Sequence, residues 1–263
     1  MSKILYASDL HGNKVLFERL FELAQKHKVD AIFYGGDICP LETSGLQQRI
    51  ENQKKFLETY LLPKAVQLKK SNISFYCIMG NGDFRINEPM LIGADKAGKL
   101  HYIHNKAAKL GNFSIVGYNF VNLFPFAVKD WEKSDIQYVK RDGIRTSPEE
   151  RTTIEQDLKQ LSKLSDPKTT IYLFHGPPFD TKLDMMHNEA HIGSKAIRQF
   201  IEEKQPFMSF HGHVHESCEV SGSYVYKIGK SLCFNPGANP FIDKAKFILA
   251  DLDDPKKTKC IDA

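Results

Sequence analysis

Five short polar clusters constrain this chain more than any other feature of its 263 residues. Each cluster combines glycine with aspartate, histidine or asparagine, or pairs aspartate with histidine, and each follows a short apolar run typical of a buried strand. In layered α/β folds the loops after the strands converge where ligands bind, so we expect the clusters to lie together. The clusters are Asp9-Leu10-His11, Gly35-Gly36-Asp37, Gly80-Asn81-Gly82-Asp83, His175-Gly176 and Gly212-His213-Val214-His215.

Helical patterns separate the apolar runs along most of the chain. The predicted strands span 3–8, 31–34, 73–79, 113–118, 169–174, 207–210, 224–227, 233–234 and 246–252. The predicted helices span 14–28, 44–68 with an interruption at Pro63, 147–164 with a start at Ser147-Pro148, and 194–204. This alternation predicts a layered α/β fold, and the closely spaced late strands indicate that part of the sheet is antiparallel.

The domain organisation is simple. The sequence has no internal repeat, low-complexity tract or flexible linker, so we predict a single domain over 1–263. Residues 119–147 break the alternation and are rich in aromatic side chains, which predicts an insertion over one end of the sheet. We expect these aromatic rings to cover the sheet, with stacking on a base as the alternative.

Composition narrows the function classes. The chain is 41% hydrophobic and 26% charged, and its net charge of +4 comes without a dense basic block, so nucleic acid is not the favoured partner. The five cysteines lack C-x-x-C spacing, which argues against a disulfide scaffold or a zinc ribbon. No apolar run could span a bilayer, and Asp9 and His11 come too early for a signal peptide. A cytoplasmic location without a membrane partner is therefore expected.

The clusters supply a set of metal ligands. Taken singly, each is typical of a turn or a helix cap, but together they offer two carboxylates, one amide oxygen and four imidazoles. Such ligands suit Mn²⁺, which we favour, or Fe, Zn²⁺ or Ni²⁺, and seven of them fit two ions that share a carboxylate. Residues two apart after a strand point the same way, so each Asp9/His11 and His213/His215 pair is expected to aim at one point. The candidate metal ligands are Asp9, His11, Asp37, Asn81, His175, His213 and His215.

In this order the five clusters resemble the calcineurin-like metallophosphoesterase superfamily, and Asn235-Pro236-Gly237 is similar to a turn found further along in those proteins. The resemblance implies a four-layer α/β/β/α sandwich with mixed sheets. It also implies a dinuclear centre in which a hydroxide bridging the two ions attacks phosphorus in line. One ion would be held by Asp9, His11, Asp37 and His215. The other would be held by Asp37, Asn81, His175 and His213. His211 is expected to have a packing role.

One position departs from the family pattern. Many members have a histidine after the Gly-Asn of the third cluster, where it stabilises the phosphoryl group or protonates the leaving oxygen, and the next acidic residue orients it. Here Gly82 takes that position, which leaves the catalytic side chain unassigned and the role of Asp83 open. General acid catalysis typically contributes roughly 10²–10⁴-fold. Because members without the histidine tend toward phosphodiesters, we favour a phosphodiester, such as a cyclic nucleotide or an activated aryl ester.

Several alternatives stay open. The same centre could serve a phosphomonoesterase, a nuclease or a nucleotide pyrophosphatase, and the substrate is expected to be a small phosphate ester. A non-catalytic scaffold, as in the retromer subunit of this superfamily, is disfavoured because all seven ligands are present. Asn81 and Arg85 are candidate substrate-binding residues, since arginine binds phosphate with a planar fork. Four histidines lie in regions that could overhang the site, although a surface role is the simpler interpretation: His101, His104, His187 and His191.

Overall fold

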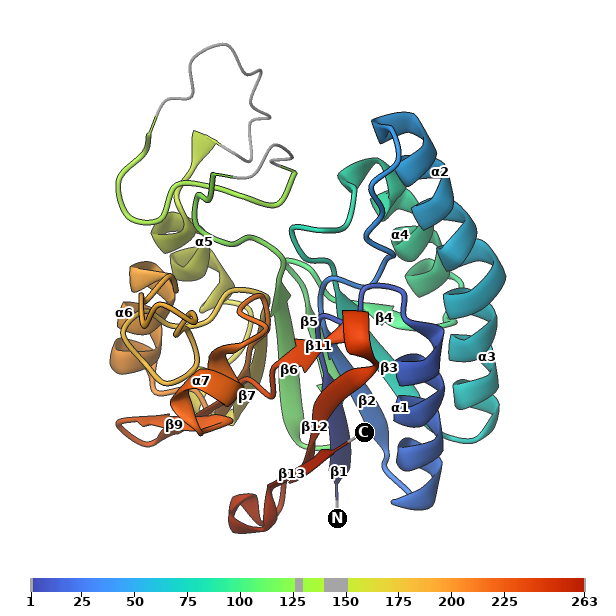
Figure 1. The fold of residues 1–263 in the computed structure, drawn as a ribbon. Helices are drawn as coiled ribbons and strands as arrows, with labels where there is room; N and C mark the ends of the chain where they lie inside the picture. The colour runs from blue at the N-terminus through green and yellow to red at the C-terminus, as the bar shows by residue number, and fades with distance from the viewer. Residues whose placement is uncertain (1, 126–129, 140–150, 263) are drawn as a thin grey trace.

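The computed structural model describes residues 2–125, 130–139 and 151–262. Two β-sheets lie against each other, and helices cover the outer face of each (Figure 1). Both sheets are mixed, as the resemblance implies. The four-layer α/β/β/α arrangement is therefore confirmed.

The first sheet has the strand order β11-β12-β1-β2-β3-β4, and β13 pairs with β12. The four strands from β1 to β4 run parallel, whereas β12 pairs antiparallel with β1, β11 and β13. Their bounds are β1 (Lys3–Ala7), β2 (Ala31–Gly35), β3 (Ser74–Ile78), β4 (His101–Tyr102), β11 (Ala238–Asn239), β12 (Lys244–Asp251) and β13 (Lys259–Asp262).

The second sheet has the strand order β5-β6-β7-β8-β10-β9. Its central strands β6, β7, β8 and β10 run parallel, and β5 and β9 pair antiparallel at the two edges. Their bounds are β5 (Ala107–Leu110), β6 (Phe113–Tyr118), β7 (Thr170–Phe174), β8 (Met208–Phe210), β9 (Val225–Ile228) and β10 (Ser231–Phe234).

The helices form the two outer layers. On the first sheet lie α1 (Lys14–Lys26), α2 (Leu46–Phe56), α3 (Leu62–Lys70) and α4 (Glu88–Lys96), and on the second lie α5 (Ile154–Leu161) and α6 (Lys195–Lys204) (Figure 1). The short α7 (Ser217–Ser221) follows β8. The remaining segments are a π-helical turn at Leu57–Leu61 and 3₁₀ turns at Arg85–Asn87, Pro167–Thr169, Pro240–Ile242 and Pro255–Lys257.

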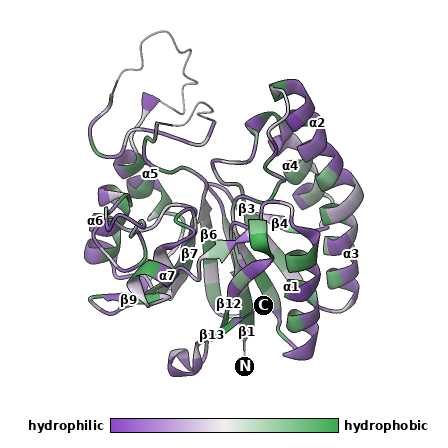
Figure 2. Ribbon diagram, viewed as in Figure 1, coloured by the Kyte–Doolittle hydropathy of each residue, from purple (hydrophilic) through white to green (hydrophobic). Residues whose placement is uncertain are grey.

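Strand side chains alternate between two hydrophobic cores. In β1, Ile4 and Tyr6 face the core between the sheets, while Leu5 and Ala7 face the helices. Burial on both faces explains why the strands are continuous apolar runs. The central strands are mainly hydrophobic, whereas the helices carry residues of both kinds (Figure 2). No helix in the described residues is long and apolar enough to cross a membrane, and all five cysteines are free.

Most predicted boundaries lie within two residues of the structure, but two helices differ. The helix predicted over 44–68 is not broken at Pro63. Instead the π-helical turn Leu57–Leu61 precedes Pro63, because proline has no N–H to donate within the helix. The predicted start at Ser147 lies outside the described residues, and α5 begins later than predicted. Its start is fixed by Thr153, whose side chain accepts a hydrogen bond from Gln156 N–H in a capping box.

Part of the predicted insertion is described. Phe120 and Trp131 are fully buried with ring centroids 5.3 Å apart, so these two rings are packed inside the protein. The fully buried Lys133 joins the segment to α5, because its Nζ lies 2.5 Å from Asp157 Oδ2. Residues 126–129 and 140–147 of this segment lie outside the described residues. The single-domain organisation stays a prediction.

Candidate metal centre

The five clusters meet where the parallel strands of both sheets end. Three follow β1, β2 and β3 of the first sheet, and two follow β7 and β8 of the second. Backbone hydrogen bonds tie the loops together, since Asp9 N–H donates to Gly36 O (3.1 Å) and Gly212 N–H donates to His175 O (3.0 Å). The convergence expected from the sequence is therefore present.

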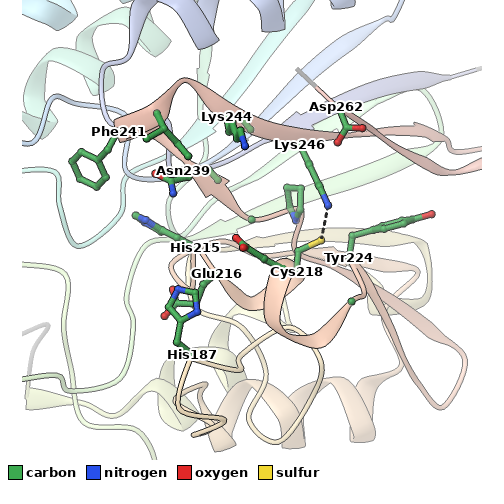
Figure 3. Close-up of a pocket in the computed structure, with 17 residues that line it drawn as sticks. His187, His215, Glu216, Cys218, Tyr224, Asn239, Phe241, Lys244, Lys246 and Asp262 are labelled. Carbon is green, nitrogen blue, oxygen red and sulfur yellow. Dashed lines mark hydrogen bonds between the residues drawn. The ribbon is translucent and has the colours of Figure 1, made fainter.

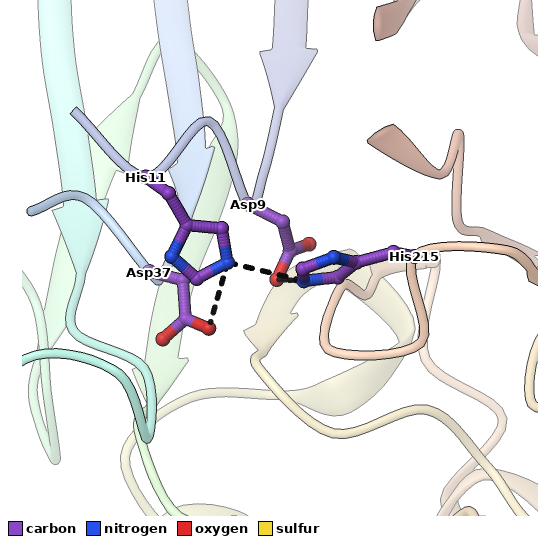
Figure 4. Close-up of side chains that lie close together, drawn as sticks. All are labelled: Asp9, His11, Asp37 and His215. Atoms are coloured by element: carbon purple, nitrogen blue, oxygen red, sulfur yellow. Dashed lines mark hydrogen bonds and ion pairs between the residues drawn. The ribbon is translucent and has the colours of Figure 1, made fainter. Parts of the chain in front are cut away.

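One group of side chains forms a compact cluster: Asp9, His11, Asp37 and His215. One ligand atom from each of the four lies within 4.8 Å of the others (Figure 4). His11 Nε2 lies 3.1 Å from His215 Nε2 and 3.4 Å from Asp37 Oδ2, and His215 Nε2 lies 3.5 Å from Asp9 Oδ1. The His215 side chain is 27% exposed, whereas the other three residues are buried. The group is an oxygen–nitrogen cage that opens to solvent at His215.

A second group lies on the other side of Asp37. His175 Nε2 is 3.4 Å from Asp37 Oδ1 and 3.0 Å from Asn81 Oδ1, and His213 Nδ1 is 2.7 Å from the same Asn81 oxygen. Asp37 therefore presents Oδ2 to the first group and Oδ1 to the second. A carboxylate placed in this way is suited to bridging two cations.

The hydrogen bonds of His175 orient its ring for a cation. Its Nδ1 lies 2.8 Å from the carbonyl oxygen of Gly35, which only accepts, so Nδ1 carries the proton. In the neutral ring the lone pair of Nε2 then faces the oxygens of Asp37 and Asn81. A backbone carbonyl that fixes the outer nitrogen in this way is the usual arrangement of a metal-binding histidine. The nitrogens of His11 and His213 that face the two groups are Nε2, 3.4 Å from Asp37 Oδ2, and Nδ1, 2.7 Å from Asn81 Oδ1. Nitrogen and oxygen donors gathered on both sides of one carboxylate fit a pair of divalent ions.

The charges of the two groups are strongly coupled. Burial alone would raise the pKa of Asp37, but the neighbouring His175 and His11 hold that pKa well below its usual range. Burial opposes protonation of His175, yet the charge of Asp37 raises the pKa of His175 to about 9. Burial lowers the pKa of His11 to about 4 and that of His213 to about 3. The anionic Asp37 thus attracts positive charge into the space between the groups.

We expect metal binding to displace a proton from His175. Because its pKa is raised to about 9, the metal-free protein keeps this proton at neutral pH, and a metal ion must compete with it. Affinity for the ion at the second group should therefore rise about tenfold per pH unit up to about pH 9. Calorimetric titration in two buffers of different ionisation enthalpy should detect the released proton. Affinity that does not change with pH would contradict this assignment.

The backbone at the site is unusual. Four candidate ligands have left-handed φ angles, namely Asp9 (60°), His11 (45°), Asp37 (53°) and His213 (68°). Non-glycine residues adopt this region at a cost of about 1 kcal/mol or more each, and such strain concentrates at functional sites. No pattern in the sequence predicted these left-handed angles.

These angles also correct one expectation. Asp9 and His11 do meet, but β1 ends at Ala7, so the turn rather than strand alternation brings them together. The prediction that His213 and His215 aim at one point is wrong. His215 joins the first group, while His213 contacts Asn81 in the second. The left-handed backbone at His213 turns the chain, so the side chains of His213 and His215 point to different groups.

The third cluster is packed tightly against Asp37. A Cβ at Gly80 would collide with Asp37 Oδ1 and His175 Nε2, so only glycine fits there. Gly82 N–H donates a hydrogen bond to Asp37 Oδ1 (2.7 Å), and a Cβ at Gly82 would lie 3.1 Å from that oxygen. Gly82 therefore fixes the bridging carboxylate even though it cannot act as an acid.

Asp83 has a structural role in this protein. Its fully buried carboxylate accepts hydrogen bonds from the backbone N–H groups of Ile38 (3.1 Å), Cys39 (2.8 Å) and Gly80 (2.9 Å). Burial and the nearby charge of Asp37 raise the pKa of Asp83 to about 6. Asp83 thus joins the loops of the second and third clusters, which answers the question that the sequence left open.

Several other candidates from the sequence have packing partners. His211 is buried, with its ring nitrogens 2.8 Å from Ser209 Oγ and 2.9 Å from Gly176 O, which agrees with its expected packing role. The Arg85 guanidinium lies over the Trp131 ring at 4.9 Å. Its role in phosphate binding stays a prediction.

Sequence reasoning missed two features beside the centre. The ring of Phe124 packs on that of His213 at 4.6 Å, and only the aromatic character of its segment hinted at this contact. A cavity of about 940 Å³ also opens beside His215, between α7 and the segment from β11 to β12 (Figure 3). Phe241, which is 73% exposed, and Lys246 line it. The cavity is assembled from segments distant in sequence, so no local pattern predicted it.

Comparison with known proteins gives a consistent result. A family model described as calcineurin-like phosphoesterase matches residues 2–217. No curated protein matches the chain. Among solved structures, protein TT1561 of Thermus thermophilus aligns with a TM-score of 0.63 at 17% identity, covering 99% of this chain and 98% of that one.

Two further structures align at lower similarity. A dimetal phosphatase from Danio rerio aligns with a TM-score of 0.54 at 13% identity, covering 99% of this chain and 98% of that one. A novel archaeal phosphodiesterase aligns with a TM-score of 0.50 at 11% identity, covering 99% of both chains. At these identities the structures support the fold alone.

Proposed function

The chain belongs to the calcineurin-like phosphoesterase family, and on that premise we propose that it hydrolyses phosphodiesters at a pair of divalent metal ions, with Mn²⁺ preferred. The observation that carries the proposal is the position of Asp37. Its two oxygens face two separate groups of nitrogen and oxygen ligands, 3.4 Å from His11 on one side and 3.4 Å from His175 on the other.

Each group would hold one ion. When bound, two divalent ions supply a hydroxide nucleophile at neutral pH and neutralise charge that develops on the phosphoryl group. The chain holds the bridging carboxylate in place through Gly82 N–H, and Asp83 holds the surrounding loops. The two proposed ligand sets are Asp9, His11, Asp37 and His215 for one ion, and Asp37, Asn81, His175 and His213 for the other.

The preference for diesters rests on Gly82 and on the cavity. Glycine cannot protonate the leaving oxygen from the position where many family members have histidine. A diester also carries a second ester group, and the cavity of about 940 Å³ beside His215 is far larger than a phosphate requires. The similar structures include one named phosphodiesterase and one named phosphatase, so this fold accommodates both activities. A small substrate and a cytoplasmic location remain expectations from the sequence.

Replacement of Gly82 by histidine tests this preference. The native protein with Mn²⁺ should hydrolyse a 4-nitrophenyl phosphodiester faster than 4-nitrophenyl phosphate. Gly82→His should raise the rate on the monoester phenyl phosphate, whose leaving group is more basic, by about 10-fold relative to Gly82→Ala, because it adds an imidazole at the usual position. Gly82→Ala is the matched control, since its Cβ imposes the same crowding 3.1 Å from Asp37 Oδ1. A native protein that strongly prefers monoesters would contradict the proposal and favour the phosphomonoesterase alternative.

A further inference from the structure

Without a histidine at position 82, the leaving oxygen needs another proton donor. All ten histidines lie in the described part of the chain, and four of them are proposed ligands. His27 is the C-cap residue of α1. Of the remaining five, four make hydrogen bonds or ring contacts, whereas His187 makes neither with the residues that the structure describes.

The contacts of these four histidines differ in kind. The ring of His101 stacks on Tyr76 at 4.4 Å. His104 is buried, and its Nδ1 accepts a hydrogen bond from Asn119 N–H (3.1 Å). His191 Nδ1 lies 2.8 Å from the buried Asp184 Oδ1. His211 is fully buried beside Ser209 and Gly176, as described above. None of the four is among the residues that line the cavity.

His187 lies at that cavity. Its exposed side chain lines the same wall as His215 and Glu216, and Figure 3 shows its imidazole projecting from the loop toward His215. No hydrogen bond joins the ring to another residue of the described part of the chain. The imidazole therefore faces the space next to the first metal group with both nitrogens available.

The loop holds His187 in a defined place. Asp184 is fully buried and accepts hydrogen bonds from Thr181 N–H (2.8 Å) and Gly193 N–H (2.9 Å), so it closes the base of the loop. At the tip, Met186 N–H donates to Ala190 O (3.0 Å) and Glu189 N–H donates to Met186 O (2.8 Å). His187 thus lies in a tight turn on an anchored loop. A proton donor positioned in advance is what general acid catalysis requires.

We propose that the leaving alcohol of the substrate occupies the cavity beside His215 and that His187 is the general acid that protonates it. This inference rests on the proposed phosphodiesterase function. The new P–O bond forms to the oxygen of water, and the P–O bond to the leaving group breaks. The leaving oxygen takes the proton of the His187 imidazolium and departs as the alcohol. The proton released by the attacking water restores the imidazolium, so the reaction consumes one water and no net proton.

The cavity also indicates the kind of alcohol. Phe241 and Ile242 are exposed (73% and 57%) and line the cavity near His215. They offer an apolar surface to a ring or another hydrophobic part of the leaving group. A general acid matters most when the leaving oxygen is strongly basic. The structure therefore fits diesters of ordinary alcohols or phenols rather than activated esters alone.

Two substrates that differ by one nitro group test the role of His187. Methyl phenyl phosphate releases phenolate, which is the more basic leaving group. Methyl 4-nitrophenyl phosphate releases 4-nitrophenolate, which leaves without a proton donor. His187→Ala should lower kcat for the phenyl ester by about 100-fold and that for the nitrophenyl ester by less than about threefold. Added imidazole should restore much of the phenyl ester rate. His27→Ala, which removes an imidazole at the end of α1, is the control and should change neither rate.

The outcomes separate this proposal from the proposed function. The His187→Ala variant should still bind two ions per chain. This metal content is measured independently of activity. Equal losses on both esters, no loss on either, or the absence of rescue by imidazole would overturn the role of His187. If the native protein binds two ions but hydrolyses neither diester, the proposed function itself fails.

Discussion

Replacing Asp37 with asparagine should abolish phosphodiester hydrolysis almost completely. Asparagine keeps the shape of the side chain but removes the charge that both groups share through Oδ1 and Oδ2. The metal pair supplies several kcal/mol of transition-state stabilisation, so kcat/KM should fall by about 10³-fold or more. Bound metal should fall as well, from two ions per chain to one or none.

A surface aspartate provides the matched control. Asp95 of α4 forms an ion pair with Lys106 (3.1 Å) and is not a proposed ligand, so Asp95→Asn should retain two ions and native activity. Circular dichroism should show that both variants are folded. Equal diester rates in Asp37→Asn and the native protein would refute a mechanism in which Asp37 bridges two ions.

A single methyl group at Gly80 should have an effect of similar size. The Cβ of Gly80→Ala would collide with Asp37 Oδ1 and His175 Nε2, where the second ion is proposed to bind. We expect this variant to bind at most one ion tightly and to lose about 10²-fold or more in kcat/KM. Titration of the metal-free variant with Mn²⁺, followed by measurement of bound metal, checks the stoichiometry directly.

Gly82→Ala is the informative comparison for Gly80→Ala. The substitution is the same and lies two residues away, but its Cβ would be 3.1 Å from Asp37 Oδ1, a contact that a small shift relieves. We therefore expect Gly82→Ala to retain two ions and most of the diester activity. If both variants behave alike, steric exclusion at the second group is not the cause.

The sequence predicted the α/β alternation and the convergence of the five clusters well because both follow local rules. Apolar runs such as that of β1 are buried on both faces, and their ends are marked by glycine next to Asp37, Asn81 or His213. The strands are short and parallel, so the polar residues after them meet at one place. These local signals were sufficient for the alternation of strands and helices and for the position of the clusters, whereas the four layers were implied by the resemblance to the superfamily.

Other features depend on contacts that no local pattern encodes. The left-handed backbone that separates His213 from His215 follows from how the loop after β8 packs on Asp9, whose carboxylate accepts a hydrogen bond from His213 N–H (3.0 Å). The structural role of Asp83 depends on backbone groups of another loop. Strand β4 has two residues, and it is held by pairing with β3 rather than by its own composition. Likewise, only the cavity distinguishes His187 from the three other histidines that could overhang the site, which are His101, His104 and His191.

A metal titration followed by activity is the most direct test of a shared dinuclear centre. Metal-free protein is titrated with Mn²⁺ while bound metal and the hydrolysis of a 4-nitrophenyl phosphodiester are measured on the same samples. The arrangement around Asp37 predicts that binding saturates at two ions per chain and that activity reaches its plateau only with the second. Full activity without metal, or saturation at a single ion, would contradict it.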